Sequence, residues 1–160
     1  MITVGPNVQV SKSRSDLVHN EVLLSADPTN PSRLLGCTMA FSPEQNKVFT
    51  IAYVSFDGGK SWEPAVTSDR GIQSGDPSCV YGMNGNAYFT AIERLEPVKM
   101  HQLVYRSKDG GKTWLPPVSL LGSGPHIDRS YVVVDQSESR FQGRVYVYGQ
   151  ITQRAVDGES

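Results

Sequence analysis

Three acidic residues recur at nearly constant spacing along this 160-residue chain and could together bind a ligand or an ion. Glu21 and Asp76 are 55 residues apart, Asp76 and Asp128 are 52 residues apart, and Arg129 follows directly. In a chain of repeated units, equivalent side chains converge on a common axis, where these groups would form a binding site. Alternatively, each acid caps a strand or bonds neighbouring backbone as part of the repeat. This structural role is favoured, because recurring residues usually serve the stacking between units.

Two similar octapeptides indicate that the chain is indeed a repeat. Residues 55–62 read Ser-Phe-Asp-Gly-Gly-Lys-Ser-Trp, and residues 107–114 read Ser-Lys-Asp-Gly-Gly-Lys-Thr-Trp. Both fit the pattern Ser-x-Asp-x-Gly-x-x-Trp, and a period of roughly fifty residues is typical of a solenoid or propeller. The residues that define the two boxes are Ser55, Asp57, Gly59, Trp62, Ser107, Asp109, Gly111 and Trp114.

The residue types in each box predict a tight hairpin corner. Glycine adopts positive φ without steric cost, and Asp bonds back to nearby backbone amides. Trp62 and Trp114 would pack beneath the turn. A calcium loop is the alternative, but it needs several acidic ligands and a distal glutamate. Each box supplies a single Asp followed by Lys60 or Lys112, so the sequence predicts no metal site here, and no other pattern indicates a cofactor.

The boxes resemble the Asp-box, or BNR repeat, of the sialidase-like β-propellers. Segments 21–31, 75–80 and 128–135 also resemble successive blade openings in bacterial BNR-repeat proteins. The resemblance covers nearly the whole chain, from about residue 20 onward. It implies that each box lies on the outer turn between the last two strands of a blade, away from any active site.

The resemblance and the strand patterns predict an all-β fold, a partial β-propeller with about two and a half four-stranded antiparallel blades. Residues 1–16 are expected to form an N-terminal arm or strand, followed by blades at 17–68 and 69–122 and an incomplete blade at 123–160. Complete propellers have about four to eight blades, so the chain is expected to be a fragment or truncated member. Its open blade edges favour self-association, with Tyr131, Val133 and Tyr146 close to the uncovered face.

The family resemblance implies glycoside chemistry but supplies no catalytic residue. Sialidases combine a tyrosine nucleophile with a glutamate, an aspartate acid/base and three arginines that clamp the substrate carboxylate. The first arginine belongs to an Arg-Ile-Pro motif, which Arg14 and Arg33 both lack. We therefore expect a module that binds carbohydrate or a cell-surface protein on its axial face. The alternatives are an exo-α-sialidase or related glycoside hydrolase with catalytic residues in further blades, and a structural or assembly propeller.

Charge, hydropathy and cysteine content narrow the partners and the compartment. With 15 basic and 16 acidic residues the net charge is −1, which argues against binding nucleic acid or anionic membrane surfaces. No window is long enough for a transmembrane helix. Cys37 and Cys79 fit no zinc motif; buried unpaired side chains are favoured, and one disulfide between neighbouring blades stays open. The resemblance implies an extracellular or periplasmic protein, although no signal peptide is visible.

Overall fold

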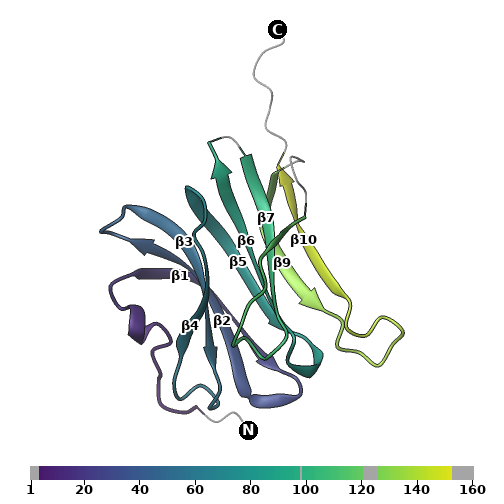
Figure 1. The fold of residues 1–160 in the computed structure, drawn as a ribbon. Coiled ribbons are helices and arrows are strands. Elements are labelled where there is room, and N and C mark those ends of the chain that lie inside the picture. Colours follow the sequence, from purple (N-terminus) through teal and green to yellow (C-terminus); the bar gives the residue numbers. More distant parts are fainter. Residues whose placement is uncertain (1–3, 98, 121–125, 153–160) are drawn as a thin grey trace.

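The computed structural model describes residues 4–97, 99–120 and 126–152. This part of the chain forms three antiparallel sheets and contains no α-helix (Figure 1). The first sheet has the order β1 (Val18–Asp27), β2 (Asn30–Ser42), β3 (Lys47–Ser55) and β4 (Glu63–Ser68). The second has the order β5 (Gln73–Tyr81), β6 (Ala87–Glu96), β7 (Lys99–Ser107) and β8 (Val118–Ser119). The third pairs β9 (His126–Val134) with β10 (Val145–Thr152).

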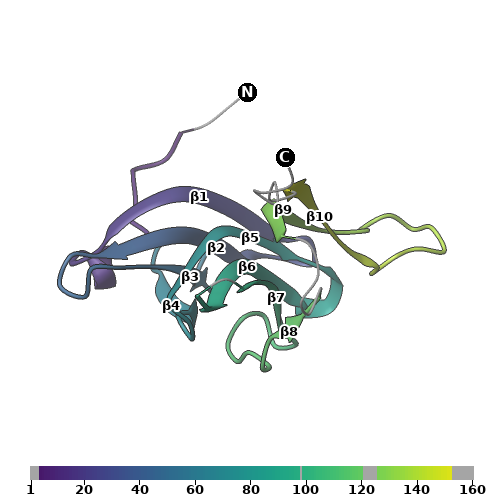
Figure 2. The ribbon, with the colours of Figure 1, turned by 90° about the horizontal axis from the view of Figure 1, so that it is seen from above.

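The three sheets follow one another in chain order, and their first strands are neighbours. β1 contacts β5, and β5 contacts β9, on the upper side of the molecule in Figure 2. The predicted all-β fold with four-stranded antiparallel sheets is confirmed, and the arrangement is consistent with part of a propeller. Each sheet lies within one predicted unit, whereas the unit boundaries stay a prediction. The last residues assigned to the third unit, 153–160, lie outside the described part of the chain.

The N-terminal segment is an arm over its described residues, 4–16, and not a strand. It contains a single 3-10 turn, η1 (Lys12–Arg14). Val10 packs on a cluster made of Leu17, Ala40, Phe49, Ile51 and Tyr53. Since neighbouring residues of a strand point to opposite faces, this cluster lies on the opposite face of β3 from Ala52 and Val54. The arm therefore helps to cover the face of the first sheet that points away from the second.

The main core lies between the first and second sheets. Leu35 and Val54 of the first sheet meet Tyr81 and Phe89 of the second, and all four are buried. Burial of large apolar side chains on both sheets contributes about 1.5–3 kcal/mol each relative to exposure. This interface is therefore the main apolar contact that holds the two sheets together.

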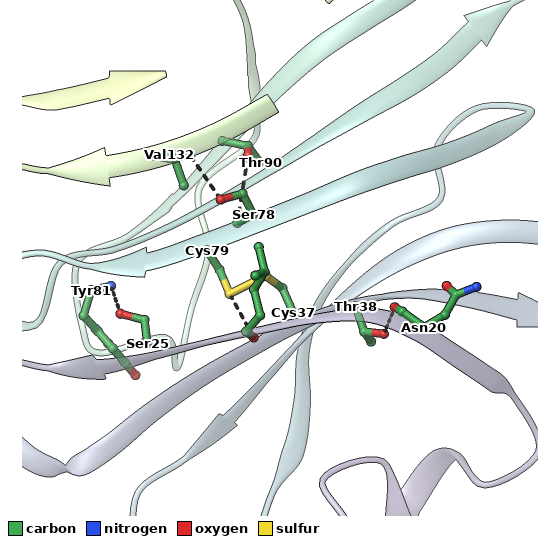
Figure 3. The surroundings of a disulfide bond; sticks show 10 residues. Asn20, Ser25, Cys37, Thr38, Ser78, Cys79, Tyr81, Thr90 and Val132 are labelled. Atoms are coloured by element: carbon green, nitrogen blue, oxygen red, sulfur yellow. Dashed lines mark hydrogen bonds between the residues drawn. A yellow bond between two sulfur atoms is a disulfide. The ribbon is translucent and has the colours of Figure 1, made fainter. Parts of the chain in front are cut away.

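A disulfide joins the same two sheets across this core. Cys37 of β2 bonds to Cys79 of β5, with 6.0 Å between the Cα atoms (Figure 3). The preference for unpaired buried cysteines was therefore wrong, and the open alternative of a disulfide between neighbouring units is what the structure contains. The spacing of the two cysteines along the chain could not predict this disulfide, because their pairing depends on how two separate sheets pack.

A fully buried carboxylate fixes the connection between the first two sheets. Glu93 accepts hydrogen bonds from Ser68 Oγ at 3.1 Å and from the backbone N–H of Gly71 at 2.6 Å. Ser68 Oγ in turn accepts a bond from the Tyr105 hydroxyl at 3.0 Å. The buried carboxyl group of Glu93 thus holds the end of β4 and the connection after it, which sets how β5 enters the second sheet.

Candidate functional site

The first strand of each sheet carries a β-bulge that contains a non-glycine residue in the left-handed backbone region. φ is 52° at Glu21, 49° at Asp76 and 51° at Arg129. The strand register shifts at each of these positions. Residues other than glycine rarely adopt such φ values, and bulges of this kind are frequent beside functional sites. The three bulges mark equivalent positions in the three sheets.

This equivalence corrects the alignment inferred from the sequence by one residue. Asp128 was aligned with Glu21 and Asp76, but the structure places Arg129 at the third bulge. The spacing from the second bulge to the third is therefore 53 residues and not 52, since 129 − 76 = 53. Asp128 is the residue immediately before the bulge, so its side chain has a different place in the repeat from the other two acids.

The structure nevertheless brings all four predicted residues together. Two neighbouring hollows, of about 320 and 480 Å³, are both lined by Glu21, Asp76 and Asp128. Arg129 lines the larger one, as does Tyr131. The three carboxylates come from three different sheets, so their meeting depends on how the sheets stack. The hollow of about 480 Å³ is the candidate site.

The carboxylates of Asp76 and Asp128 interact directly within the site. Burial raises the pKa of Asp76 from its ordinary value, and the neighbouring Asp128 carboxyl raises it further. The backbone N–H of Arg129 opposes this shift, because it donates a 2.7 Å hydrogen bond to Asp76 Oδ2. Asp76 therefore holds a proton more readily than a free aspartate. It also accepts a hydrogen bond from the backbone of the next sheet, which is the structural role considered from the sequence.

The two Asp-boxes form closed corners between the last two strands of their sheets. In the first, Ser55 Oγ accepts from the N–H of Gly59 at 2.9 Å, while Asp57 accepts from the N–H and hydroxyl of Ser61 at 2.9 and 2.6 Å. Trp62 Nε1 donates to the carbonyl oxygen of Gly59 at 3.1 Å. The second box, between β7 and β8, repeats this pattern with its own residues.

These hydrogen bonds stabilise the ionised form of each box carboxylate. The Thr113 hydroxyl and N–H lower the pKa of Asp109 to about 2, and the same contacts from Ser61 hold the pKa of Asp57 well below its ordinary value. None of the eight box residues lines either hollow. Their local bonding agrees with the predicted hairpin corners. In the described part of the chain, no group of three or more His, Cys, Asp or Glu side chains is placed to hold a metal ion.

The third sheet presents an aromatic face beside the candidate site. Tyr131, Val133, Tyr146 and Tyr148 are all substantially exposed. Tyr131 and Tyr148 are directly paired across β9 and β10, and their rings stack with centroids 5.6 Å apart. Because Tyr131 also lines the larger hollow, this face continues from the rim of the site onto the open side of the sheet.

Two relevant residues were not found from the sequence. Ser130 lines the larger hollow and is only 2% exposed, yet its Oγ has no hydrogen-bond partner in the described structure. Arg33 forms an ion pair of 3.3 Å with the buried carboxylate of Asp27 and lies against the backbone of Gly85 and Gly110. Neither role has a sequence signal, since each depends on neighbours from distant parts of the chain.

Comparison with known proteins identifies the box motif itself. The BNR/Asp-box repeat family matches residues 53–64. The chain contains a BNR/Asp-box repeat. No curated protein matches it. A crystal structure of a protein of unknown function from Dyadobacter fermentans DSM 18053 is similar, with 16% identity and a TM-score of 0.48. The match covers 66% of this chain and 37% of that one. Among the described residues, no helix is long and apolar enough to cross a membrane.

Proposed function

We propose that this chain is a sialidase-like Asp-box module whose larger hollow, from here on called the axial hollow, binds carbohydrate. The observation that carries the proposal is the convergence of Glu21, Asp76 and Asp128 from three sheets on the larger hollow and its neighbour. Carboxylates accept hydrogen bonds from sugar hydroxyl groups, and an aromatic ring at the rim, here Tyr131, offers a face for the apolar side of a sugar. A concave site with a few convergent polar groups is the usual form of a small-molecule site.

The strained bulges add support to this proposal. A left-handed non-glycine residue costs of order 1–3 kcal/mol, and such strain tends to persist where it positions a functional group. Here it occurs three times, at Glu21, Asp76 and Arg129, all of which line the same hollow. Stacking alone explains the bond that Asp76 makes to Arg129, but it does not require charged side chains at all three bulges.

Hydrolysis of a glycoside is the second candidate function. A carboxyl group that keeps its proton near neutral pH is what a glycosidase needs as general acid, and the raised pKa of Asp76 is a step in that direction. Release of free sialic acid from a sialoside, lost on Asp76→Asn, would establish this activity. The missing Arg-Ile-Pro motif makes simple binding the better-supported proposal.

The test of binding is a glycan array probed with the chain and with two variants. Asp128→Ala removes a carboxylate from the hollow and should weaken binding by about tenfold, as loss of a charged hydrogen bond predicts. Glu138→Ala changes an exposed carboxylate in the loop before β10, away from the hollow, and should bind normally. Absence of binding to every glycan and to a cell-surface glycoprotein extract would refute the proposal.

We also propose that the protein is exported. The Cys37–Cys79 disulfide supports this, because disulfides persist mainly in oxidising compartments. Fractionation of the native host, with the thiol state measured by alkylation and mass spectrometry, tests it. Free thiols in a cytoplasmic pool would contradict the proposal.

A further inference from the structure

We propose that the axial hollow selects uncharged sugars and rejects sugars that carry a carboxylate, sialic acid included. The inference rests on the proposed carbohydrate binding and adds the class of ligand. Two features of the larger hollow carry it: the balance of charges along its lining and the unpartnered hydroxyl group of Ser130.

The charge along the hollow is predominantly negative. Besides the phenol of Tyr131, its ionisable lining groups are three carboxyl groups, Glu21, Asp76 and Asp128, and one guanidinium, Arg129. Counted as formal charges, three carboxyl groups face one guanidinium, and the raised pKa of Asp76 reduces this excess of negative charge without reversing its sign. A ligand carboxylate that entered this space would meet repulsion at short range. At about 6 Å and an intermediate effective dielectric, each like-charge contact costs on the order of a tenfold loss in affinity.

Arg129 does not alter this balance by clamping an anion. Recognition of a carboxylate by arginine is strongest when the guanidinium forms two parallel hydrogen bonds in a dry site. Arg129 is exposed, so water competes with any hydrogen bond that its guanidinium would make to an anion, and its backbone N–H bonds to Asp76. Among the described residues, Arg129 is the one arginine along the lining of the hollow, where it lies with three acids.

Ser130 provides the independent indication of a ligand. The residue is only 2% exposed, and its hydroxyl group has no hydrogen-bond partner among the described residues. A buried hydroxyl without a partner costs about 1–3 kcal/mol, so it is expected where a ligand supplies the missing bond. A hydroxyl can both donate to and accept from a sugar hydroxyl group, whereas an ionised carboxylate only accepts. Together, these groups match a ligand with several neighbouring hydroxyl groups.

The experiment uses pairs of sugars that differ by one carboxylate. Lactose is compared with sialyllactose, and methyl glucoside with methyl glucuronide, by saturation-transfer NMR and calorimetry on the 160-residue chain at low and high salt. The neutral member of at least one pair should bind, and its acidic partner should bind about tenfold more weakly at low salt. The difference should shrink at high salt, because salt screens repulsion between partly exposed charges.

Two variants distinguish the proposed preference for uncharged sugars from unselective sugar binding. Asp128→Asn removes one charge but leaves the bond between Asp76 and Arg129, so the discrimination between paired sugars should fall. Ser130→Ala should lose most neutral-sugar binding without any fall in its melting temperature, since it removes a buried hydroxyl that makes no bond to the described residues. Ser13→Ala, in the exposed N-terminal arm, is the matched control and should bind as the unchanged chain does.

The possible failures are distinguishable. If the acidic member of a pair binds as tightly as the neutral one or more tightly, the charge argument is wrong while carbohydrate binding stands. Normal binding by Ser130→Ala would remove the second support and overturn the assignment of that hydroxyl. If no sugar of either kind binds, both this inference and the proposed function fail.

Discussion

The backbone N–H of Arg129 donates a 2.7 Å hydrogen bond to Oδ2 of Asp76, so the bulge of β5 holds the bulge of β9. We expect Asp76→Ala to lower the free energy of unfolding by about 1–2 kcal/mol, because the N–H of Arg129 loses its acceptor. Asp76→Asn keeps an acceptor oxygen and should cost less. Urea denaturation of both variants at neutral pH measures the difference, and equal losses would contradict this role.

The carboxyl group of Asp76 should also make a contribution to stability that is larger at low pH. Since the pKa of Asp76 is raised in the folded state, the folded protein binds the Asp76 proton more tightly than the unfolded chain does. Its contribution to stability is therefore present below about pH 4 and is lost as the pH rises through the higher folded value. Asp76→Asn should remove this dependence, whereas Glu138→Gln should leave it unchanged.

The carboxylates of the Asp-boxes should make stability depend on pH in the opposite direction to Asp76. The pKa of Asp109 is lowered to about 2, first by the Thr113 hydroxyl and then by the Thr113 N–H. Its stabilisation is present above the unfolded pKa of about 4 and is lost as the pH falls toward 2. Because this carboxylate is exposed, we expect the effect to stay below about 1 kcal/mol. Acid titration of Asp109→Asn should show a flatter decline in stability over this window than the unchanged chain shows.

Two glycines, one in each box, allow the stability cost of backbone strain to be measured apart from the cost of steric overlap. Gly58 has φ of +72°, and no described atom lies within 4 Å of the place that a Cβ would take, so Gly58→Ala should cost only about 1–2 kcal/mol of backbone strain. At Gly111, φ is +93° and a Cβ would lie 2.7 Å from Val54 Cγ1. Gly111→Ala should therefore cost at least about 1 kcal/mol more. Val54→Ala in the Gly111→Ala background should recover part of that excess; no recovery would assign the whole loss to strain.

The disulfide should contribute a large part of the stability. Its cysteines are 42 residues apart, and closing a loop of that size stabilises the folded state by about 3–4 kcal/mol in the chain-entropy model. Cys37→Ala with Cys79→Ala should lower the melting temperature by roughly 10 °C in a domain of this size. Calorimetry with and without reductant checks it. An unchanged melting temperature on reduction would show that the bond adds little.

The exposed face of Tyr131, Val133, Tyr146 and Tyr148 predicts self-association, since uncovered apolar patches and unpaired strand edges favour contacts between copies. Light scattering on a sizing column should give a mass above that of one 17.5 kDa chain at high concentration. Tyr148→Lys should shift the mass toward the monomer, whereas Lys12→Ala in the N-terminal arm should not. A monomer at all concentrations would contradict this prediction.

Features encoded within a few neighbouring residues could be predicted from the sequence. Each Asp-box closes with hydrogen bonds among its own eight residues, so the corners at Asp57 and Asp109 follow from local chemistry. The repeat period also indicated that Glu21 and Asp76 would lie together, because equivalent strands are neighbours, and Asp128, one residue before the equivalent position, lines the same two hollows.

Features that depend on contacts between sheets could not be predicted in the same way. The sequence alignment matched acidic residues, whereas the residue at the third bulge is basic, so Arg129 was not recognised as the equivalent of Asp76. Two other features also arise only when separate strands meet. One is the bond between Cys37 and Cys79, and the other is the hydroxyl of Ser130, which has no partner among the described residues. Sequence period determines which residues face the same way, whereas packing determines which of them touch.

The bond between Cys37 and Cys79 also has a mechanical consequence. If tension is applied to the two ends of the chain, the 42 residues from one cysteine to the other cannot be drawn out while the bond is intact. At about 3.4 Å per extended residue, roughly 140 Å of contour length stays hidden from the force. The chain has only two cysteines, so no second disulfide ties the third sheet to the second. The force would therefore first peel away β9 and β10, while the first two sheets remain tied together until a reductant acts.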